Sequence, residues 1–289
     1  MKRFPLWTFG VCLLMLGFGF PRALMAAEPG PKLGVEIGFD FASGDYGTDT
    51  TTDSYSIPLK IRYAPVPRLD FELTIPYIYQ SNSTTLYAGG IRYNVMPRQM
   101  STASAASAKT QAMGPGGTGT TVGYDTNHSA SGLGDITLTG GYILVPESAD
   151  VPQIRPLVYV KFPTADKNEG LGTGEFDFGG GLSLSKWVGP WNLYGEGRYI
   201  TQGSNDALGL KDYVTYEGDL GYAISRYLFP QVVIWGASAP ADNSSSLLEA
   251  KLVLNYRWSP VAGGSVYVLK GLATGSPDYG LGLSFFRNF

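Results

Sequence analysis

The sequence predicts an all-β protein: an antiparallel transmembrane β-barrel of about twelve strands, with short periplasmic turns and long outer loops. Apolar and polar residues alternate along most of the chain, as in Leu69–Tyr77 (LDFELTIPY), and this period of two is typical of a strand with one apolar face. Short and long connections alternate as well, so every short turn lies at one end of the sheet. Outer-membrane barrels sort their turns in this way, whereas a Greek-key sandwich has no reason to.

Residues 1–27 are predicted to be a secretory signal peptide. Lys2 and Arg3 precede an apolar run, and a small-residue patch, Ala23–Ala27, follows it. The run is too short and too rich in glycine for a spanning helix. The domain plan is therefore a signal at 1–27 and one barrel at 28–289. Cys12 is the only cysteine and lies in the signal, so the rest of the chain has no thiol or disulfide chemistry.

The charge of the chain argues against nucleic acid as a partner. The whole chain has a net charge of −3, and the predicted signal holds three cations and no acid, so the remainder carries −6. After the signal, no further run reaches the roughly 18 apolar residues that a spanning helix needs. An exported, glycine-rich chain of this kind agrees with a barrel in the outer membrane of a Gram-negative bacterium.

The strands follow one another without a helical period of comparable strength. The segment 230–238 is apolar on both faces, so its register stays open at this point. The predicted strands, in chain order, lie at 33–41, 55–63, 69–77, 136–144, 157–162, 175–184, 193–199, 214–224, 230–238, 248–258, 267–269 and 279–289.

The two faces of these strands differ sharply in charge. We expect the nearly uncharged face to meet lipid, because aromatic residues mark the strand ends as they do in the interfacial girdles of membrane barrels. Those aromatic residues are Tyr55, Tyr63, Tyr77, Tyr79, Trp187, Trp191, Tyr199, Tyr256 and Trp258. The predicted pore-lining residues are Glu36, Asp40, Lys60, Arg62, Asp70, Glu72, Lys161, Glu175, Asp177, Glu196, Arg198, Glu217, Asp219, Glu249, Lys251 and Arg257.

The mixture of acidic and basic residues on the lumenal face predicts a network of charges across a wet lumen, not a strongly ion-selective ring. A barrel of about twelve strands is wide enough for a narrow pore, and it can also be filled by its own side chains. We favour the narrow pore.

The segment 81–132 is predicted to be a long extracellular loop. It is rich in Ser, Thr, Ala and Gly, with stretches such as STASAASAKT and GPGGTGTT. Structureless loops of this length are either functional or disordered. The segment either folds into the lumen as a constriction or extends outside the barrel, and its composition favours partial disorder.

Catalytic and metal chemistry find little support. His128 is the only histidine, and it lies in the low-complexity loop without a nucleophile placed beside it by the pattern. Metal sites built from several His or Cys ligands are excluded. The glycine-rich stretches at 114–119 and 170–175 lack the helix and the Lys-Ser/Thr pair of a phosphate loop, so they are turn glycines. We expect no enzyme activity and no cofactor.

Residues 132–201 resemble the outer-membrane family named for the MetA pathway of phenol degradation. The matching features are Gly132–Asp135, Phe162–Thr164, Gly170–Gly174 and Trp191–Tyr194. The resemblance implies a barrel that acts as a transporter or channel, with some members linked to aromatic catabolism, and it brings no catalytic residues. The C-terminal strand GLGLSFFRNF ends in Phe289 and is similar to the strand that the barrel-assembly machinery recognises.

These observations lead to two functions of different classes. The first is passive uptake of small solutes, aromatic ones among them, through the lumen, with outer-membrane lipids, the assembly machinery and the solute as partners. The alternative is a plugged barrel that serves as a structural or surface-interaction protein and displays its long outer loops. A membrane-embedded enzyme that depends on His128 is a third reading.

Overall fold

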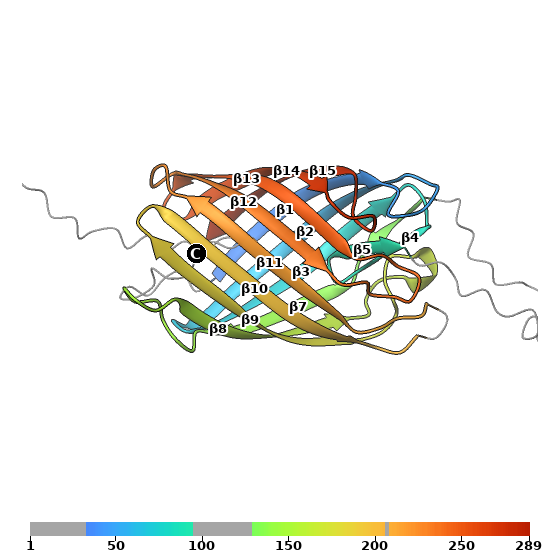
Figure 1. Ribbon diagram of the computed structural model, residues 1–289, viewed down its shortest axis with the longest axis horizontal. Helices are drawn as coiled ribbons and strands as arrows, with labels where there is room; N and C mark the ends of the chain where they lie inside the picture. The colour runs from blue at the N-terminus through green and yellow to red at the C-terminus, as the bar shows by residue number, and fades with distance from the viewer. Residues whose placement is uncertain (1–32, 95–128, 206–207) are drawn as a thin grey trace, which may run out of the picture.

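The computed structural model describes residues 33–94, 129–205 and 208–289, and it forms a single elongated barrel (Figure 1). The predictions made for the signal peptide, for Cys12 and for His128 concern residues outside these ranges. Among the described residues, no helix is both long and apolar enough to cross a membrane. The short 3-10 turn Lys167–Glu169 lies between two strands.

The predicted class is confirmed: an antiparallel sheet of thirteen strands closes on itself, because the first strand pairs with both the second and the last. Two of the thirteen, β6 and β7, are pieces of one strand interrupted at Gly134 and Asp135, and both pair with β3. The wall is therefore a twelve-stranded barrel. Its strands are β1 (Leu33–Gly44), β2 (Thr52–Val66), β3 (Leu69–Gln80), β6 (Ala130–Leu133), β7 (Ile136–Tyr142), β8 (Gln153–Phe162), β9 (Asp177–Val188), β10 (Trp191–Gln202), β11 (Tyr213–Tyr222), β12 (Leu228–Ala237), β13 (Leu247–Ser259), β14 (Ala262–Gly271) and β15 (Tyr279–Asn288).

Most connections sort by length to the two ends of the barrel, as the sequence predicts; the exception is 143–152, which lies at the end that holds the tightest turns. Residues 67–68, 189–190 and 260–261 make the tightest turns, and the chain terminates at the same end, which we call the short-turn end (Figure 1). The connections 45–51, 163–176 and 272–278 lie at the opposite, long-loop end. This arrangement corresponds to periplasmic turns and outer loops in the outer membrane.

Side chains alternate between the outside and the inside of the wall. Val158 and Leu252 on the outer face are 63% and 60% exposed, whereas Val233 and Asn192 on the inner face are fully buried. The open register of 230–238 is thereby settled, with Val233 inside. Of the nine predicted girdle residues, Trp187 is the exception, because its ring packs inside the barrel, 5.7 Å from the buried Phe229.

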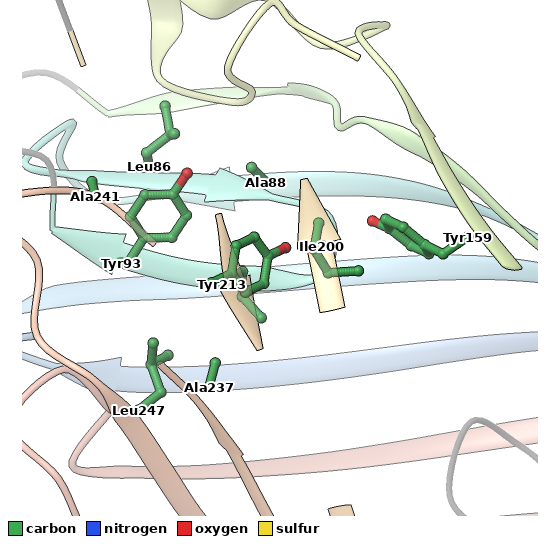
Figure 2. Close-up of a cluster of buried hydrophobic side chains, with 10 residues drawn as sticks. Leu86, Ala88, Tyr93, Tyr159, Ile200, Tyr213, Ala237, Ala241 and Leu247 are labelled. Atoms are coloured by element: carbon green, nitrogen blue, oxygen red, sulfur yellow. The ribbon is translucent and has the colours of Figure 1, made fainter. Parts of the chain in front are cut away.

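Part of the segment 81–132 forms a second small sheet inside the barrel. The strands β4 (Thr85–Ala88) and β5 (Ile91–Asn94) pair around Gly89-Gly90, and both glycines have positive φ, as a two-residue hairpin turn requires. Of the two arrangements predicted for the loop, the described part through Asn94 adopts the one in which it folds into the lumen. Residues 95–128 lie outside the described ranges. Figure 2 shows hairpin residues Leu86, Ala88 and Tyr93 among the wall residues Tyr159, Ile200, Tyr213, Ala237 and Leu247.

Candidate functional site

A buried latch holds the β4–β5 hairpin in the lumen. Arg92 of β5 donates from Nη1 to Oε1 of Gln80 at 2.5 Å and to Oγ1 of Thr85 at 3.3 Å, and its guanidinium carbon lies 5.4 Å from the ring centroid of Tyr87. Gln80 in turn donates from Nε2 to the carbonyl oxygen of Thr85 at 3.3 Å. Burial lowers the pKa of Arg92 below the ordinary arginine value, and the nearby Tyr46 and Tyr87 act in the opposite direction.

The root of the hairpin is fixed to the start of β2. Oγ1 of Thr52 donates to Oδ1 of Asn82 at 2.9 Å, and Nδ2 of Asn82 donates to the carbonyl oxygen of Thr51 at 2.9 Å. The amide of Tyr87 donates to the carbonyl oxygen of Gly170 at 3.3 Å, which ties the hairpin to the β8–β9 loop. The hairpin is therefore held from two sides of the barrel mouth.

A fully buried cation lies close to the hairpin tip. Lys161 of β8 has no exposed surface, and its Nζ lies 2.8 Å from Oδ2 of Asp177 and 3.3 Å from Oδ2 of Asp135. It also donates to Oγ1 of Thr173 at 2.6 Å. A Cβ on Gly89 would lie 3.6 Å from Cδ of Lys161, which places the tip of the hairpin beside this cluster. The cluster joins three neighbouring parts of the wall at the long-loop end.

Beneath the hairpin the lumen holds a cavity of about 360 Å³. One side of it is the hairpin itself, through Tyr87, Gly89 and Arg92. The facing wall brings together charged groups and large rings. Rings that line the cavity come from Tyr46, Tyr159, Tyr213, Trp235 and Tyr267, in addition to Tyr87.

Most charges of the cavity wall are paired. Nε of Arg198 lies 2.5 Å from Oε1 of Glu196, and Nζ of Lys251 lies 3.2 Å from Oε2 of Glu249. The hydroxyl of Tyr267 donates to Oδ1 of Asp40 at 2.7 Å. These pairs leave the cavity polar and wettable, and they keep its rings beside fixed charges of both signs.

The short-turn half of the lumen is filled by buried polar side chains. Arg62 bridges Glu72 at 2.6 Å and Glu36 at 3.5 Å, and Arg155 is paired with Asp70 at 2.5 Å. Further toward the turns, Asn255 donates to Oε1 of Gln231 at 2.7 Å, and Arg257 is 4% exposed. We call these residues the short-turn layer; it forms the floor of the lumen below the cavity.

The sixteen residues predicted to line the pore divide among four places. Eight line the cavity, five lie deeper at the short-turn end, two lie in the buried cluster at the long-loop end, and one lies in the loop before β9. In that order they are Asp40, Lys60, Glu72, Glu196, Arg198, Glu217, Glu249 and Lys251; Glu36, Arg62, Asp70, Asp219 and Arg257; Lys161 and Asp177; and Glu175.

Several lumenal residues escaped the sequence reasoning. Arg155 was missed because it precedes Pro156, which delayed the predicted start of the strand to residue 157. Arg92 and Tyr87 lie in the loop whose composition favours disorder, although the pattern Leu86–Ala88, Gly-Gly, Ile91–Tyr93 is a hairpin signal that was available. Asp135 is part of the Gly132–Asp135 motif, but the sequence did not predict its ion pair with Lys161.

The described residues show no grouping suited to a metal ion: three or more His, Cys, Asp or Glu side chains are nowhere placed together to hold one. What the arrangement offers chemically is binding by charge, hydrogen bond and ring contact in the cavity.

Comparison with solved structures shows which known barrels are similar to this one. A solved outer-membrane channel from Pseudomonas putida F1 is similar, with a TM-score of 0.64, 16% identity, and coverage of 91% of this chain and 97% of that one. The KdgM porin in complex with disordered oligogalacturonate gives a TM-score of 0.51 at 7% identity, with 89% and 99% of the two chains covered. At these identities the likeness establishes the fold. Among curated proteins, none matches the chain.

A sequence family supplies the identity that the fold alone does not. The family model described as "Putative MetA-pathway of phenol degradation" matches residues 107–285, which is more than half of the chain. This span contains the strands from β6 to β14 and most of β15. The chain belongs to the family of the MetA pathway of phenol degradation.

Proposed function

We propose that this protein is a channel in the outer membrane of a Gram-negative bacterium and that small solutes, aromatic ones among them, cross it passively through the lumen. The observation that carries the proposal is the cavity of about 360 Å³, because it is a solute-sized space inside the barrel with charged and aromatic walls. Outer barrel surfaces rich in Leu, Val and aromatic residues support contact with lipid.

The aromatic preference rests on the rings that face this cavity. Tyr159, Tyr213 and Trp235 offer faces and edges to an aromatic solute, and such ring pairs add about 0.5–1.5 kcal/mol beyond buried area. The family description, which refers to phenol degradation, agrees with a solute of this kind. We propose no enzymatic role for the described residues, and His128→Ala tests the enzymatic reading directly.

The test is conductance of the refolded, signal-free protein in a planar lipid bilayer, with and without aromatic alcohols and acids. We expect discrete current steps that one solute class blocks. Glu196→Gln and Glu249→Gln each remove a negative charge from the cavity wall and are expected to shift the reversal potential in a salt gradient toward anions. Glu147→Gln, at the short-turn end, is the matched control. An unchanged reversal potential in both cavity variants contradicts the assignment of the charge filter.

A second candidate function is favoured by the short-turn layer. Arg62, Arg155 and Asn255 close off much of the lumen with buried, hydrogen-bonded contacts, as in a plugged barrel that displays its long outer loops. A correctly folded barrel that stays electrically silent supports this candidate. Loss of phage or cell-surface binding on deletion of the long loop, without any change in conductance, supports it as well.

A further inference from the structure

The cavity wall formed by β10 and β11 carries more carboxylates than cations. Glu196 and Glu217 are direct cross-strand partners, and Asp219 follows Glu217 on the same lumenal face of β11. Directly opposed like charges destabilise a strand pair. Arg198 pairs with Glu196 at 2.5 Å, whereas the described residues provide neither a hydrogen bond nor an ion pair for the carboxylate of Glu217. Glu217 therefore presents an uncommitted acidic group to the cavity.

Asp219 independently indicates an incomplete site. This residue is 5% exposed, and neither of its carboxylate oxygens has a hydrogen-bond partner among the described residues. A buried polar group without a partner costs free energy and calls for an explanation such as a bound ligand. Its position two residues from Glu217, toward the short-turn end, puts this second carboxyl group just below the cavity wall.

The rings beside these acids already accommodate an ammonium group. Trp235 is the cross-strand partner of Glu217, and Nζ of Lys251 lies 5.9 Å from the ring centroid of Trp235 and 5.7 Å from that of Tyr267. The same ammonium lies 3.2 Å from a carboxylate oxygen of Glu249. A carboxylate with ring faces is the chemistry that recognises amines. The ammonium of Lys251 is thus an example, within the protein, of the positively charged amino group that this wall stabilises.

We propose that the cavity binds small solutes that carry a protonated amino group on an apolar or aromatic body, with the ammonium at Glu217 and the body against Trp235. This inference rests on the proposed channel function and specifies its solute class. A metal ion is not the expected ligand, since no group of three candidate ligands is placed for one in the described ranges. An anionic solute is disfavoured, because the cavity cations outside ion pairs already have neighbours. Lys60 is the cross-strand partner of Glu36, and the guanidinium of Arg92 donates to Gln80 and lies over the ring of Tyr87.

The test is calorimetric titration of the detergent-folded barrel with three probes of one body: 2-phenylethylamine, 2-phenylethanol and 3-phenylpropionate. We expect the amine to bind about tenfold more tightly than the alcohol, since about 1.4 kcal/mol of charge interaction corresponds to that factor. Glu217→Gln should remove this advantage and Glu217→Asp should keep most of it. Asp53→Asn, which removes a negative charge at the long-loop end outside the cavity, should leave it unchanged.

The outcomes separate this inference from the channel itself. Equal binding of amine and alcohol by the wild-type barrel overturns the inference, and so does tighter binding of the carboxylate. Calorimetry needs no current, so a silent barrel that still prefers the amine removes the channel function while the binding site stands. Current steps without a preference for the amine support the channel function and overturn the proposed amine site. If Glu217→Gln does not refold, the three probes on the wild-type protein still decide between these outcomes.

Discussion

Nη1 of Arg92 lies 2.5 Å from Oε1 of Gln80, and this contact joins β5 of the lumenal hairpin to the end of β3. Replacing Arg92 with Met should lower the free energy of unfolding by about 1–3 kcal/mol, because Gln80 then loses a buried partner. Loss of the latch should also raise channel conductance as the hairpin loosens. Urea unfolding of the detergent-folded barrel and bilayer recordings measure the two effects.

The control for the latch is Arg226→Met, since Arg226 is an exposed arginine at the short-turn end that also lies over a tyrosine ring. Its effect on stability and conductance should be negligible. An Arg92→Met protein with wild-type stability would show that the hairpin is held by other contacts.

The two adjacent glycines at the hairpin tip differ in the space that surrounds them. Gly89 and Gly90 both have positive φ, but only at Gly89 does an added Cβ meet a neighbour, the hydroxyl of Tyr159 at 2.6 Å. Gly90→Ala should cost about 1–2 kcal/mol for the left-handed backbone alone. Gly89→Ala should cost more, and Tyr159→Phe should recover part of the difference. Equal unfolding midpoints for the two alanine variants would contradict the packed tip.

Lys161 should be one of the most sensitive positions in the wall. Lys161→Met leaves Asp135 and Asp177 buried without their cation, and breaking a buried ion pair on one side costs about 3–5 kcal/mol. Lys186→Met is the comparison, because the side chain of Lys186 is partly exposed and its Nζ lies 4.0 Å from a single carboxylate, that of Glu147. The free energies of unfolding of the two variants in urea give the answer. A cost for Lys161→Met no larger than for Lys186→Met would refute the structural role of the cluster.

Removal of the whole hairpin tests its role as a constriction. Gln80 and Ala130 are direct cross-strand partners, so an Asn-Gly turn in place of residues 81–129 can join β3 to β6. We expect conductance to rise by about twofold or more, because the lumen of a barrel this size is narrow enough for one hairpin to obstruct. Unchanged single-channel current in a folded deletion variant would place the limiting constriction in the short-turn layer.

The C-terminal residue provides a test of cellular assembly. The amide of Phe289 donates to the carbonyl oxygen of Leu33 at 2.8 Å, while its side chain is 64% exposed. Phe289→Ala keeps the backbone bond and removes the ring. We expect much less barrel in the outer membrane of cells but normal refolding of the purified protein in detergent. Equal loss in both settings would indicate a structural role and not recognition by the assembly machinery.

The alternation of apolar and polar residues was sufficient to predict the barrel, because lipid on one side and a polar lumen on the other impose a strict period of two. The pattern weakened where the wall departs from this rule. Val233 and Trp235 face the lumen although they are apolar, so the register of β12 was open. Tyr267 and Leu269 of β14 also face the lumen although they are apolar. The sequence therefore predicted only a short strand there, 267–269.

The lumenal contacts were harder to predict because pairing across a barrel depends on strands far apart in the sequence. Arg155 and Asp70 meet across β8, β7 and β3, and no local spacing reveals that pair. The hairpin was hidden by composition: a stretch rich in small residues suggests disorder, whereas a Gly-Gly turn between alternating strands indicates order. Here the local turn chemistry prevailed because the tyrosines and aliphatic residues of the wall bury Leu86 and Tyr93.

The pairing of β1 with β15 has a kinetic consequence. These strands are joined at ten positions, from Gly34 opposite Asn288 to Ser43 opposite Tyr279, so the seam unites the two ends of the described barrel. Until the last strand is available, both margins of the sheet have unpaired amides and carbonyls, and the nascent molecule is prone to aggregate. The barrel wall can therefore close only after β15 has been made, and a chain that lacks this strand cannot close. The β4–β5 hairpin becomes enclosed in the lumen when β1 and β15 pair.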